Sequence, residues 1–361
     1  MKRSNTLNKV FFAFLALVVV MACSVFFYRL YLAHSIKARL DGYLHTMTAY
    51  DGHIDSVDVS LLQVAYSIHG MKITKKGSIA KEPFFEAPRI DVGLDWPSFH
   101  KGRVLSRVVV YSGQLNFVSG PNQNQTQIGI GQDWLLILGG LAPVPINLFC
   151  VQGGEVHYLD PYGSPPVDVK MERIRLRAGN LYVKSDAQNL DPGSITLTAG
   201  IMDDAHLEFH AAFDPYALKP TFDYKAGLDG LKLAALNPVF MRYAGMRVQS
   251  GLVDVYSEGD CSGGNYQGYI LPTISDLRIM KSNFDPRTMI KKFLVGVLVW
   301  TFTDKKDQMM AKFPFSGQFK DPSTNIWTAP AYIFENGFTK ALPHGLAGLA
   351  LMEGIEKSAA K

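Results

Sequence analysis

The chain has 361 residues, 47% of them hydrophobic, so it is long enough to bury a sizeable core in one large domain or two ordinary ones. Its 36 basic and 32 acidic residues give a formal net charge of only +4, which gives no reason to expect nucleic acid as a partner. The 22 Phe, 16 Tyr and 4 Trp residues are not interleaved with a basic stripe, as a nucleic-acid groove would require.

The first predicted element is a transmembrane anchor at residues 10–28. Val10 to Phe27 carries no charge over 18 residues, and a helix of that length spans roughly 27 Å, close to the bilayer core of about 30 Å. Tyr28 and Arg29 follow where interfacial side chains hold a span in place. A cleaved signal peptide and lipidation at Cys23 are the alternatives, but the apolar run exceeds the usual signal core and bulky residues resume after Cys23.

Orientation and compartment are predicted from the residues around the anchor. The polar residues 1–9 are expected to stay in the cytoplasm while the rest of the chain is exported, although flanking basic residues are nearly balanced between the two sides. Cys150 and Cys261 lie outside the anchor. They could form one disulfide in an oxidising compartment or stay as unpaired thiols, and their spacing favours neither.

After the anchor, a linker helix is predicted at residues 29–50 and a first β block at residues 51–118. Apolar residues recur on one helical face from Ile36 to Met47. The β block shows short apolar–polar alternations separated by glycine and proline turns. Residues 119–145 are rich in Gly, Asn and Gln at their start and are predicted to form a polar loop and a short helix.

A second β block is predicted for residues 146–322. Its clearest strands are the segments 154–159, 206–213 and 222–231. Each alternates apolar with polar residues at period two, which gives a sheet one apolar and one polar face.

Two local irregularities are predicted within this second block. Between Met171 and Ile174 the alternation slips by one residue, and a β-bulge there would keep Ile174 on the apolar face and Arg173 in water. The glycine-rich residues after Cys261 predict a hairpin turn.

The sequence changes in character after Pro286. Residues 287–303 are strongly apolar and flanked by lysines, and they are predicted to form a helix that caps one end of the sheet. A helix lying in a membrane interface is the alternative, since the apolar core of this segment is too short to span a bilayer. One more strand is expected at 313–319, and residues 323–361 are predicted to be a helical segment.

No recognisable motif predicts catalysis or cofactor binding in this sequence. His206 and His210 flank Glu208 at a spacing that could suit a metal on a helix, but the segment alternates as a strand. There the three side chains share the polar face, which favours a solvent-facing role. We therefore expect no enzyme activity, cofactor or metal.

Several strings follow one another in a recognisable order after the anchor. They are Pro88–Trp96, Gly102–Tyr111, Gln114–Val118, Pro166–Val169, Tyr243–Glu258, Gly268–Leu277 and Phe313–Pro322. In this order and spacing they resemble the AsmA-like family of bacterial envelope proteins, most closely its short single-anchor branch with a domain of unknown function. Together the strings cover most of the chain after the anchor.

This resemblance implies an inner-membrane anchor and a mainly β periplasmic body, shaped as an elongated, curled antiparallel β-sheet groove with an apolar lining. It also implies a role in phospholipid transport or outer-membrane integrity, without catalytic residues. The chain is short for such a role. Roughly twelve strands at about 4.8 Å each give a sheet of roughly 55 Å, so transport across an envelope would need a partner, oligomerisation or a shuttle role.

Two functional hypotheses follow. The first is a membrane-anchored groove that binds phospholipid or another acyl-chain ligand. Its expected lining residues are Val109, Tyr111, Leu115, Phe117, Ile174, Leu176, Leu207, Phe209, Phe213, Phe222, Tyr224, Val253 and Val255. The second is a non-enzymatic envelope scaffold or assembly factor with a closed β core, which binds other envelope proteins through its polar face or loop. An open apolar trough favours the first hypothesis, and a packed core without a cavity favours the second.

Overall fold

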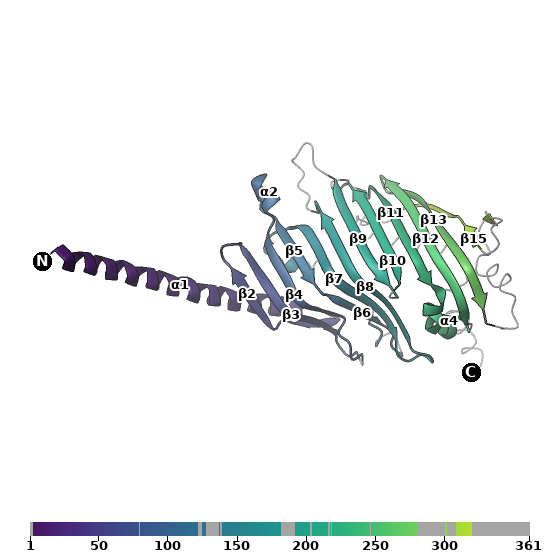
Figure 1. Ribbon diagram of the computed structural model, residues 1–361, viewed down its shortest axis with the longest axis horizontal. Coiled ribbons are helices and arrows are strands. Elements are labelled where there is room, and N and C mark those ends of the chain that lie inside the picture. The colour runs from purple at the N-terminus through teal and green to yellow at the C-terminus, as the bar shows by residue number, and fades with distance from the viewer. Residues whose placement is uncertain are drawn as a thin grey trace.

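A computed structural model describes residues 3–319 of the chain except 79, 122–124, 128–136, 138, 182–191, 203, 216, 218, 246, 281–299 and 302–307. One long N-terminal helix leads into a large, curled, mainly antiparallel sheet (Figure 1). This confirms the predicted mainly β fold class. The helical segment predicted for 323–361 lies outside the described residues.

The N-terminal helix α1 (Arg3–His45) is continuous and is long and apolar enough to cross a membrane. Side chains from Phe11 to Tyr31 are exposed, whereas Leu40 and Leu44 are buried in the protein core. The predicted anchor and linker helix are therefore one helix, because no proline or glycine interrupts the chain between them. The helix ends at His45 rather than at residue 50, since Tyr50 begins the first strand and is fully buried.

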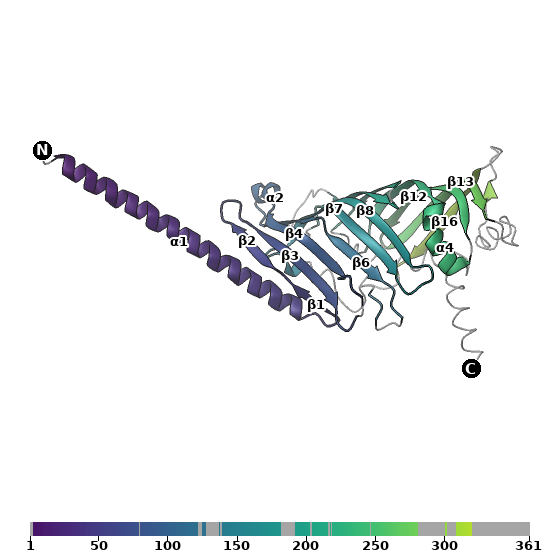
Figure 2. The same ribbon diagram turned by 60° about the horizontal axis from the view of Figure 1, so that its bottom comes forward.

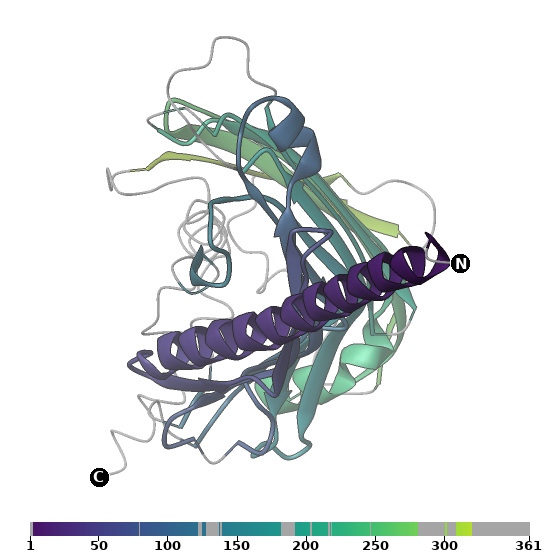
Figure 3. The same cartoon turned by 90° about the vertical axis from the view of Figure 1, so that its left-hand side faces the viewer.

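Six strands and a short helix make up the part of the sheet nearest α1. They are β1 (Tyr50–His53), β2 (Ser56–Ser60), β3 (Ala65–Lys75), β4 (Phe85–Leu94), α2 (Trp96–His100), β5 (Ser106–Tyr111) and β6 (Gln114–Val118). β3 pairs with β1, β2 and β4 in antiparallel register. Figure 3 shows α1 passing across this end of the curled sheet.

The next strand, β7 (Ile146–Asp160), is paired differently from the predicted antiparallel arrangement. It runs parallel to both β5 and β6. Parallel neighbours need a crossover connection of a dozen or more residues, and the segment 119–145 supplies one. Within that segment Ile137, Gly139 and Gly140 are helical, and Ile137 and Leu141 are buried.

The remaining described elements extend the sheet away from α1. They are β8 (Val167–Gly179), β9 (Gly193–Ile201), β10 (Ala205–Phe213), β11 (Phe222–Lys232), η1 (Leu233–Leu236), α4 (Asn237–Ala244), β12 (Val248–Ser262), β13 (Asn265–Ile279), β14 (Trp300–Thr301), β15 (Gln308–Ala311) and β16 (Phe313–Gln318). Over the described residues the sheet has 16 strands, and both predicted β blocks contribute to it. Its main path passes through 13 strands, which at about 4.8 Å per step gives a length of about 58 Å.

The predicted bulge and hairpin are confirmed. The register of β8 with β9 shifts between Glu172 and Arg175, and Arg173 has a left-handed φ of 54°. Ile174 is consequently buried while Arg173 and Arg175 are exposed. β12 and β13 are joined by a tight turn at Gly263 and Gly264, whose φ values of 57° and 86° suit glycine.

The prediction for residues 287–303 is wrong at its C-terminal end. Trp300 and Thr301 form β14, which pairs with β15, so hydrogen bonding to a neighbouring strand overrides the helical pattern there. The rest of that segment lies outside the described residues. The strand expected at 313–319 is present as β16.

The hydrophobic core lies where α1 meets β1–β7. Its buried members include Leu44, Ile68, Ile90 and Val108, and Leu141 packs among them. The Tyr66 hydroxyl donates a hydrogen bond to the Leu141 carbonyl oxygen, and burial raises the pKa of Tyr66 to about 12. Because Leu40 and Leu44 also belong to this core, the last turns of α1 are part of the folded body.

Truncation of this core should be costly compared with truncation further along the same sheet. Ile68 is fully buried, so Ile68→Ala should lower the free energy of unfolding by about 2–5 kcal/mol. Leu207 on β10 is only half-buried, so Leu207→Ala should cost roughly 1 kcal/mol. Urea unfolding of the full chain in mild detergent, followed by circular dichroism, measures both. Equal losses would contradict this division of the sheet.

The bulge at Arg173 provides a second prediction. Its left-handed backbone is strained for a β-branched residue, so Arg173→Val should lower the free energy of unfolding by about 1–3 kcal/mol. Arg175→Val is the matched control, because Arg175 is exposed on the same strand without a positive φ. Arg173→Gly should be much milder than Arg173→Val in the same unfolding assay. If the glycine variant were equally unstable, backbone strain would not be the cause.

Candidate functional site

The sheet has two chemically different faces, which the strand register assigns. Residues paired across strands share a face, and successive residues on a strand alternate between faces. We call the side that carries Ile90 the apolar face and the side that carries Asp91 the polar face. Figure 1 shows the strands side by side, so that each face is continuous along the molecule.

One row of the apolar face crosses twelve strands from β2 to β16. Its members are Val57, Ile68, Ile90, Val110, Val151, Leu176, Leu197, Phe209, Ala226, Ser257, Ile270 and Phe313. Ser257 is the single polar side chain in this row. The neighbouring row on the polar face instead carries Arg177, His210, Lys225 and Glu258.

Burial along the apolar face changes with distance from α1. Ile68, Ile90 and Val110 are 4% exposed or less, because α1 and the segment around Leu141 cover them. From β8 onward Leu176 and Phe209 are only half-buried. The apolar side chains of the proximal part are therefore used in the core, whereas those of the distal part stay accessible.

Eleven of the thirteen predicted lining residues lie on the apolar face. They are Leu115, Phe117, Ile174, Leu176, Leu207, Phe209, Phe213, Phe222, Tyr224, Val253 and Val255. Leu115 and Phe117 pack against the proximal core, and the other nine lie from β8 to β12. The register thus brings most of the predicted set onto one side of the sheet.

The prediction is wrong for Val109 and Tyr111, which lie on the polar face. Val109 pairs with Asp91 and Tyr111 pairs with Arg89, whose guanidinium carbon lies 5.3 Å from the Tyr111 ring centroid. The run from residue 108 to 111 is apolar on both sides of the strand, so its own pattern does not fix the parity. Pairing of Val110 with Ile90 decides it.

Aromatic rings gather on the distal apolar face around Tyr224. The ring of Tyr224 stacks on Phe209 with centroids 6.0 Å apart, and its hydroxyl is 3.0 Å from the Ser257 hydroxyl. Gly259 lies beneath it, since a Cβ there would come within 2.9 Å of Tyr224 Cε1. Burial raises the pKa of Tyr224, which keeps this phenol neutral. The glycine therefore lets an aromatic ring lie flat on the sheet.

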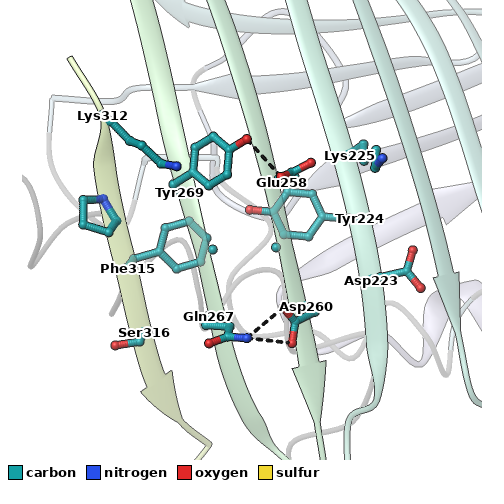
Figure 4. Close-up of a pocket in the computed structure, with 13 residues that line it drawn as sticks. Asp223, Tyr224, Lys225, Glu258, Asp260, Gln267, Tyr269, Lys312, Phe315 and Ser316 are labelled. Atoms are coloured by element: carbon teal, nitrogen blue, oxygen red, sulfur yellow. Dashed lines mark hydrogen bonds between the residues drawn. The ribbon is translucent and has the colours of Figure 1, made fainter. Parts of the chain in front are cut away.

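A hollow of about 640 Å³ lies at the same end of the sheet, over β11, β12, β13 and β16. Its lining is mixed in charge, with Asp223, Lys225, Glu258, Asp260 and Lys312 among its residues. Figure 4 shows Lys312, Tyr269 and Glu258 gathered at one end of this hollow, with Gln267 and Asp260 at the other. The Lys312 ammonium lies 3.7 Å from the Tyr269 ring centroid, in cation–π geometry.

Glu258 is the electrostatic centre of this hollow. It accepts hydrogen bonds from the hydroxyls of Tyr256 at 2.6 Å and Tyr269 at 2.9 Å. These donors stabilise the ionised carboxylate and hold the pKa of Glu258 below its usual value. The same carboxylate opposes ionisation of the phenols, raising the pKa of Tyr256 to about 12 and that of Tyr269 in the same direction. We call Tyr256, Glu258 and Tyr269 the Glu258 cluster. At neutral pH its carboxylate is ionised and both of its phenols are neutral.

Of the two alternatives left open for Cys150 and Cys261, the structure has the unpaired thiols and no disulfide. Cys150 is on β7 and Cys261 is on β12, and four strands separate them in the sheet. Five strand steps amount to about 24 Å, far beyond disulfide reach. Both thiols are free, and burial raises the pKa of Cys261.

In the part of the chain that the structure describes, no group of three or more His, Cys, Asp or Glu side chains is placed to hold a metal ion. His206 Nε2 lies 3.1 Å from a Glu208 oxygen on the polar face, and both side chains are more than half exposed. His210 is exposed on the same face.

The Glu258 cluster was not among the sequence-predicted site residues. Tyr256 and Glu258 are two apart on one strand, which gives them a common face, but Tyr269 joins them only through the pairing of Glu258 with Tyr269. The local pattern could have indicated the first two residues. The third needs the hairpin register between β12 and β13.

Comparison with models of known protein families finds no match, and no curated protein matches the chain. The resemblance to the AsmA-like family therefore stays a prediction based on the strings quoted above. Over the described residues the fold combines a long apolar N-terminal helix with a large curled sheet, one face of which is predominantly apolar.

The Glu258 cluster makes a direct pH prediction. Glu258→Gln weakens the hydrogen bond that the Tyr256 hydroxyl donates and removes the negative charge that opposes phenolate formation, so the pKa of Tyr256 should fall from about 12 toward its ordinary value of about 10. Ultraviolet titration of tyrosine, taken as the difference from the Tyr256→Phe variant, isolates this one group. Glu208→Gln is the control, because Glu208 pairs with His206 and should leave the titration unchanged. An unshifted Tyr256 in the Glu258 variant would contradict this assignment.

Proposed function

We propose that this protein is a single-pass membrane protein whose curled sheet holds lipid acyl chains on its distal apolar face. The observation that carries the proposal is the row of apolar side chains that continues, with Ser257 as its one polar member, from the core to β16. Acyl chains have no hydrogen-bonding groups and are best matched by a continuous apolar surface of this kind.

Half-burial of the distal residues supports the proposal. Soluble surfaces rarely present extended apolar patches, and those that do commonly bind another apolar object. Along β8–β12 the half-buried residues Leu176, Leu207, Phe209 and Val255 share one face. The opposite face of the same strands carries exposed charged residues such as Arg177 and Lys225. An apolar ligand would therefore be held on one side and water kept on the other.

The apolar helix supports the membrane part of the proposal. α1 exposes apolar side chains from Phe11 to Phe27 and then enters the body, so the sheet would be tethered rigidly next to a bilayer. We place the anchor in a bacterial inner membrane with the sheet in the periplasm, on the strength of the sequence resemblance. In this proposal phospholipid is the ligand, and the protein supports phospholipid transport or outer-membrane integrity without enzymatic activity or cofactor.

The alternative is a scaffold or assembly factor with a closed β core that binds other envelope proteins. The tightly packed core at β1–β7 favours it for the proximal part of the sheet. The half-buried residues of β8–β12 favour lipid, so the two functions differ in what contacts the distal apolar face.

Site-specific photocrosslinking distinguishes them in intact cells. p-Benzoylphenylalanine replaces Phe209 on the apolar face in one variant and His210 on the polar face in the other, so the two probes differ by a single residue. Cells grown with radioactive phosphate should give a labelled phospholipid adduct at 209 and none at 210. A protein adduct at 209 would favour the scaffold, and equal labelling at both positions would contradict a lipid-holding face.

Charge substitution provides a second, quantitative test. A carboxylate in contact with acyl chains costs several kcal/mol, so Phe209→Asp with Leu176→Asp should reduce bound phospholipid by roughly tenfold or more. His210→Asp with Arg177→Asp is the matched control on the same strands but the polar face. Native mass spectrometry of the full chain in detergent counts the lipid, and circular dichroism checks the fold. Equal lipid in all three proteins would overturn the proposal.

A further inference from the structure

The end of the sheet nearest the N-terminal half of α1 carries a group of exposed apolar side chains. They come from the β2–β3 turn and from the segment that contains α2, and we call them the end patch: Leu61, Leu62, Val64, Trp96, Phe99 and Val104. Leu62 is 97% exposed, Val64 58% and Phe99 46%. These side chains do not pack into the core, and so many exposed apolar residues at one end are typical of a surface that contacts a partner or a membrane.

The fold brings the two segments of the end patch together. The Leu94 amide donates a hydrogen bond of 3.2 Å to the carbonyl oxygen of Val64, so the β2–β3 turn adjoins the start of α2. β3 and β4 are paired there, with Ala65 opposite Gly93. The turn and the helix therefore form one surface.

Buried polar contacts hold α2 in place beneath this surface. Asp95 is 5% exposed and accepts hydrogen bonds from the Ser98 hydroxyl at 2.5 Å and the Asn147 amide at 2.8 Å. With its polar side fixed in this way, α2 exposes Trp96 and Phe99, whose rings meet edge to face 5.6 Å apart. The hydrogen bonds of Asp95 therefore fix α2 in the orientation that exposes these two rings.

The position of the end patch relative to α1 suggests what covers it. Figures 1 and 2 show the β2–β3 turn and α2 at the end of the sheet that is directed toward the N-terminus of α1. α1 is exposed up to Tyr31 and is partly buried against the core from Leu32 onward. A bilayer around the apolar part of α1 would therefore end close to the end patch.

The charges beside the end patch suit a membrane surface. Lys101 and Arg107 are exposed and Arg103 is half-buried, all within the segment that follows α2. The one acidic residue between positions 95 and 107 is Asp95, which is buried and hydrogen-bonded. Aromatic and aliphatic side chains flanked by basic residues are the combination that binds an anionic membrane interface.

We propose that the end patch docks the body onto the same bilayer that α1 crosses, with Leu62, Trp96 and Phe99 inserted at the interface. This inference rests on the part of the proposed function that places α1 in a membrane, and it does not depend on lipid held by the distal apolar face. It gives the protein a second membrane contact. The sheet then keeps a fixed orientation to the bilayer instead of swinging about the end of the helix.

Spin-label accessibility of the full chain in nanodiscs of phosphatidylcholine and phosphatidylglycerol tests the docking. The background carries Cys23→Ala, Cys150→Ala and Cys261→Ala. One leucine is then replaced by a spin-labelled cysteine in each of three matched variants. These are Leu62→Cys in the end patch, Leu17→Cys in the exposed part of α1 and Leu252→Cys, exposed on β12. Circular dichroism confirms that each variant folds as the parent does.

Collisions with oxygen report lipid, and collisions with a water-soluble nickel chelate report solvent. We expect the label at 17 to collide mainly with oxygen, the label at 252 mainly with nickel, and the label at 62 more with oxygen than with nickel. If 17 reports lipid while 62 behaves as 252 does, the docking is overturned and the anchor stands. A label at 62 shielded from both reagents would show a protein partner or second copy there, which also overturns the docking. If 17 reports water, both the anchor and the docking fail.

Discussion

Hydrogen-bonded register is the constraint on which the rest of this structure depends. A strand that slipped by one residue would turn its apolar side chains to the polar face. The register avoids this across twelve strands, so that Val57 and Phe313 belong to the same row. The bulge at Arg173 has a specific role here, because it takes up one extra residue and returns Ile174 and Leu176 to the apolar face.

The same face has two environments, and α1 creates the difference. Near the helix, Leu40 and Leu44 belong to one buried cluster with Ile68 and Ile90, which excludes water from the sheet. Beyond β7 the described helices touch the sheet at β8, through α4, and at β11 and β12, through η1. The proximal strands therefore stabilise the fold, and the distal strands keep apolar surface that a ligand could occupy. This division explains how one alternating pattern can serve both stability and binding.

α1 also joins its exposed apolar part to the sheet without a hinge, because one continuous helix leads from exposed apolar side chains into the buried core. The end patch and the row that begins at Val57 lie at the same end of the body, since β2 leads directly into the turn that carries Leu62. Together, the two proposals place the membrane surface next to the start of the apolar face. A lipid leaving the bilayer would pass the covered proximal strands before it met the accessible apolar side chains of β8–β12.

The sequence by itself determined the local features of this protein. Period-two alternation identified β10 and β11, the lack of charge in Val10–Phe27 identified the apolar helix, and the parity slip before Ile174 located the bulge. These features depend on residues close together in the chain, so a short stretch of sequence is enough to predict each of them. Tertiary structure decided the rest. It put Val109 and Tyr111 on the polar face, set β7 parallel to β5, separated Cys150 from Cys261 and joined Tyr269 to Glu258. Each of these outcomes depends on which strand lies beside which, and that is fixed by pairing between residues far apart in the sequence.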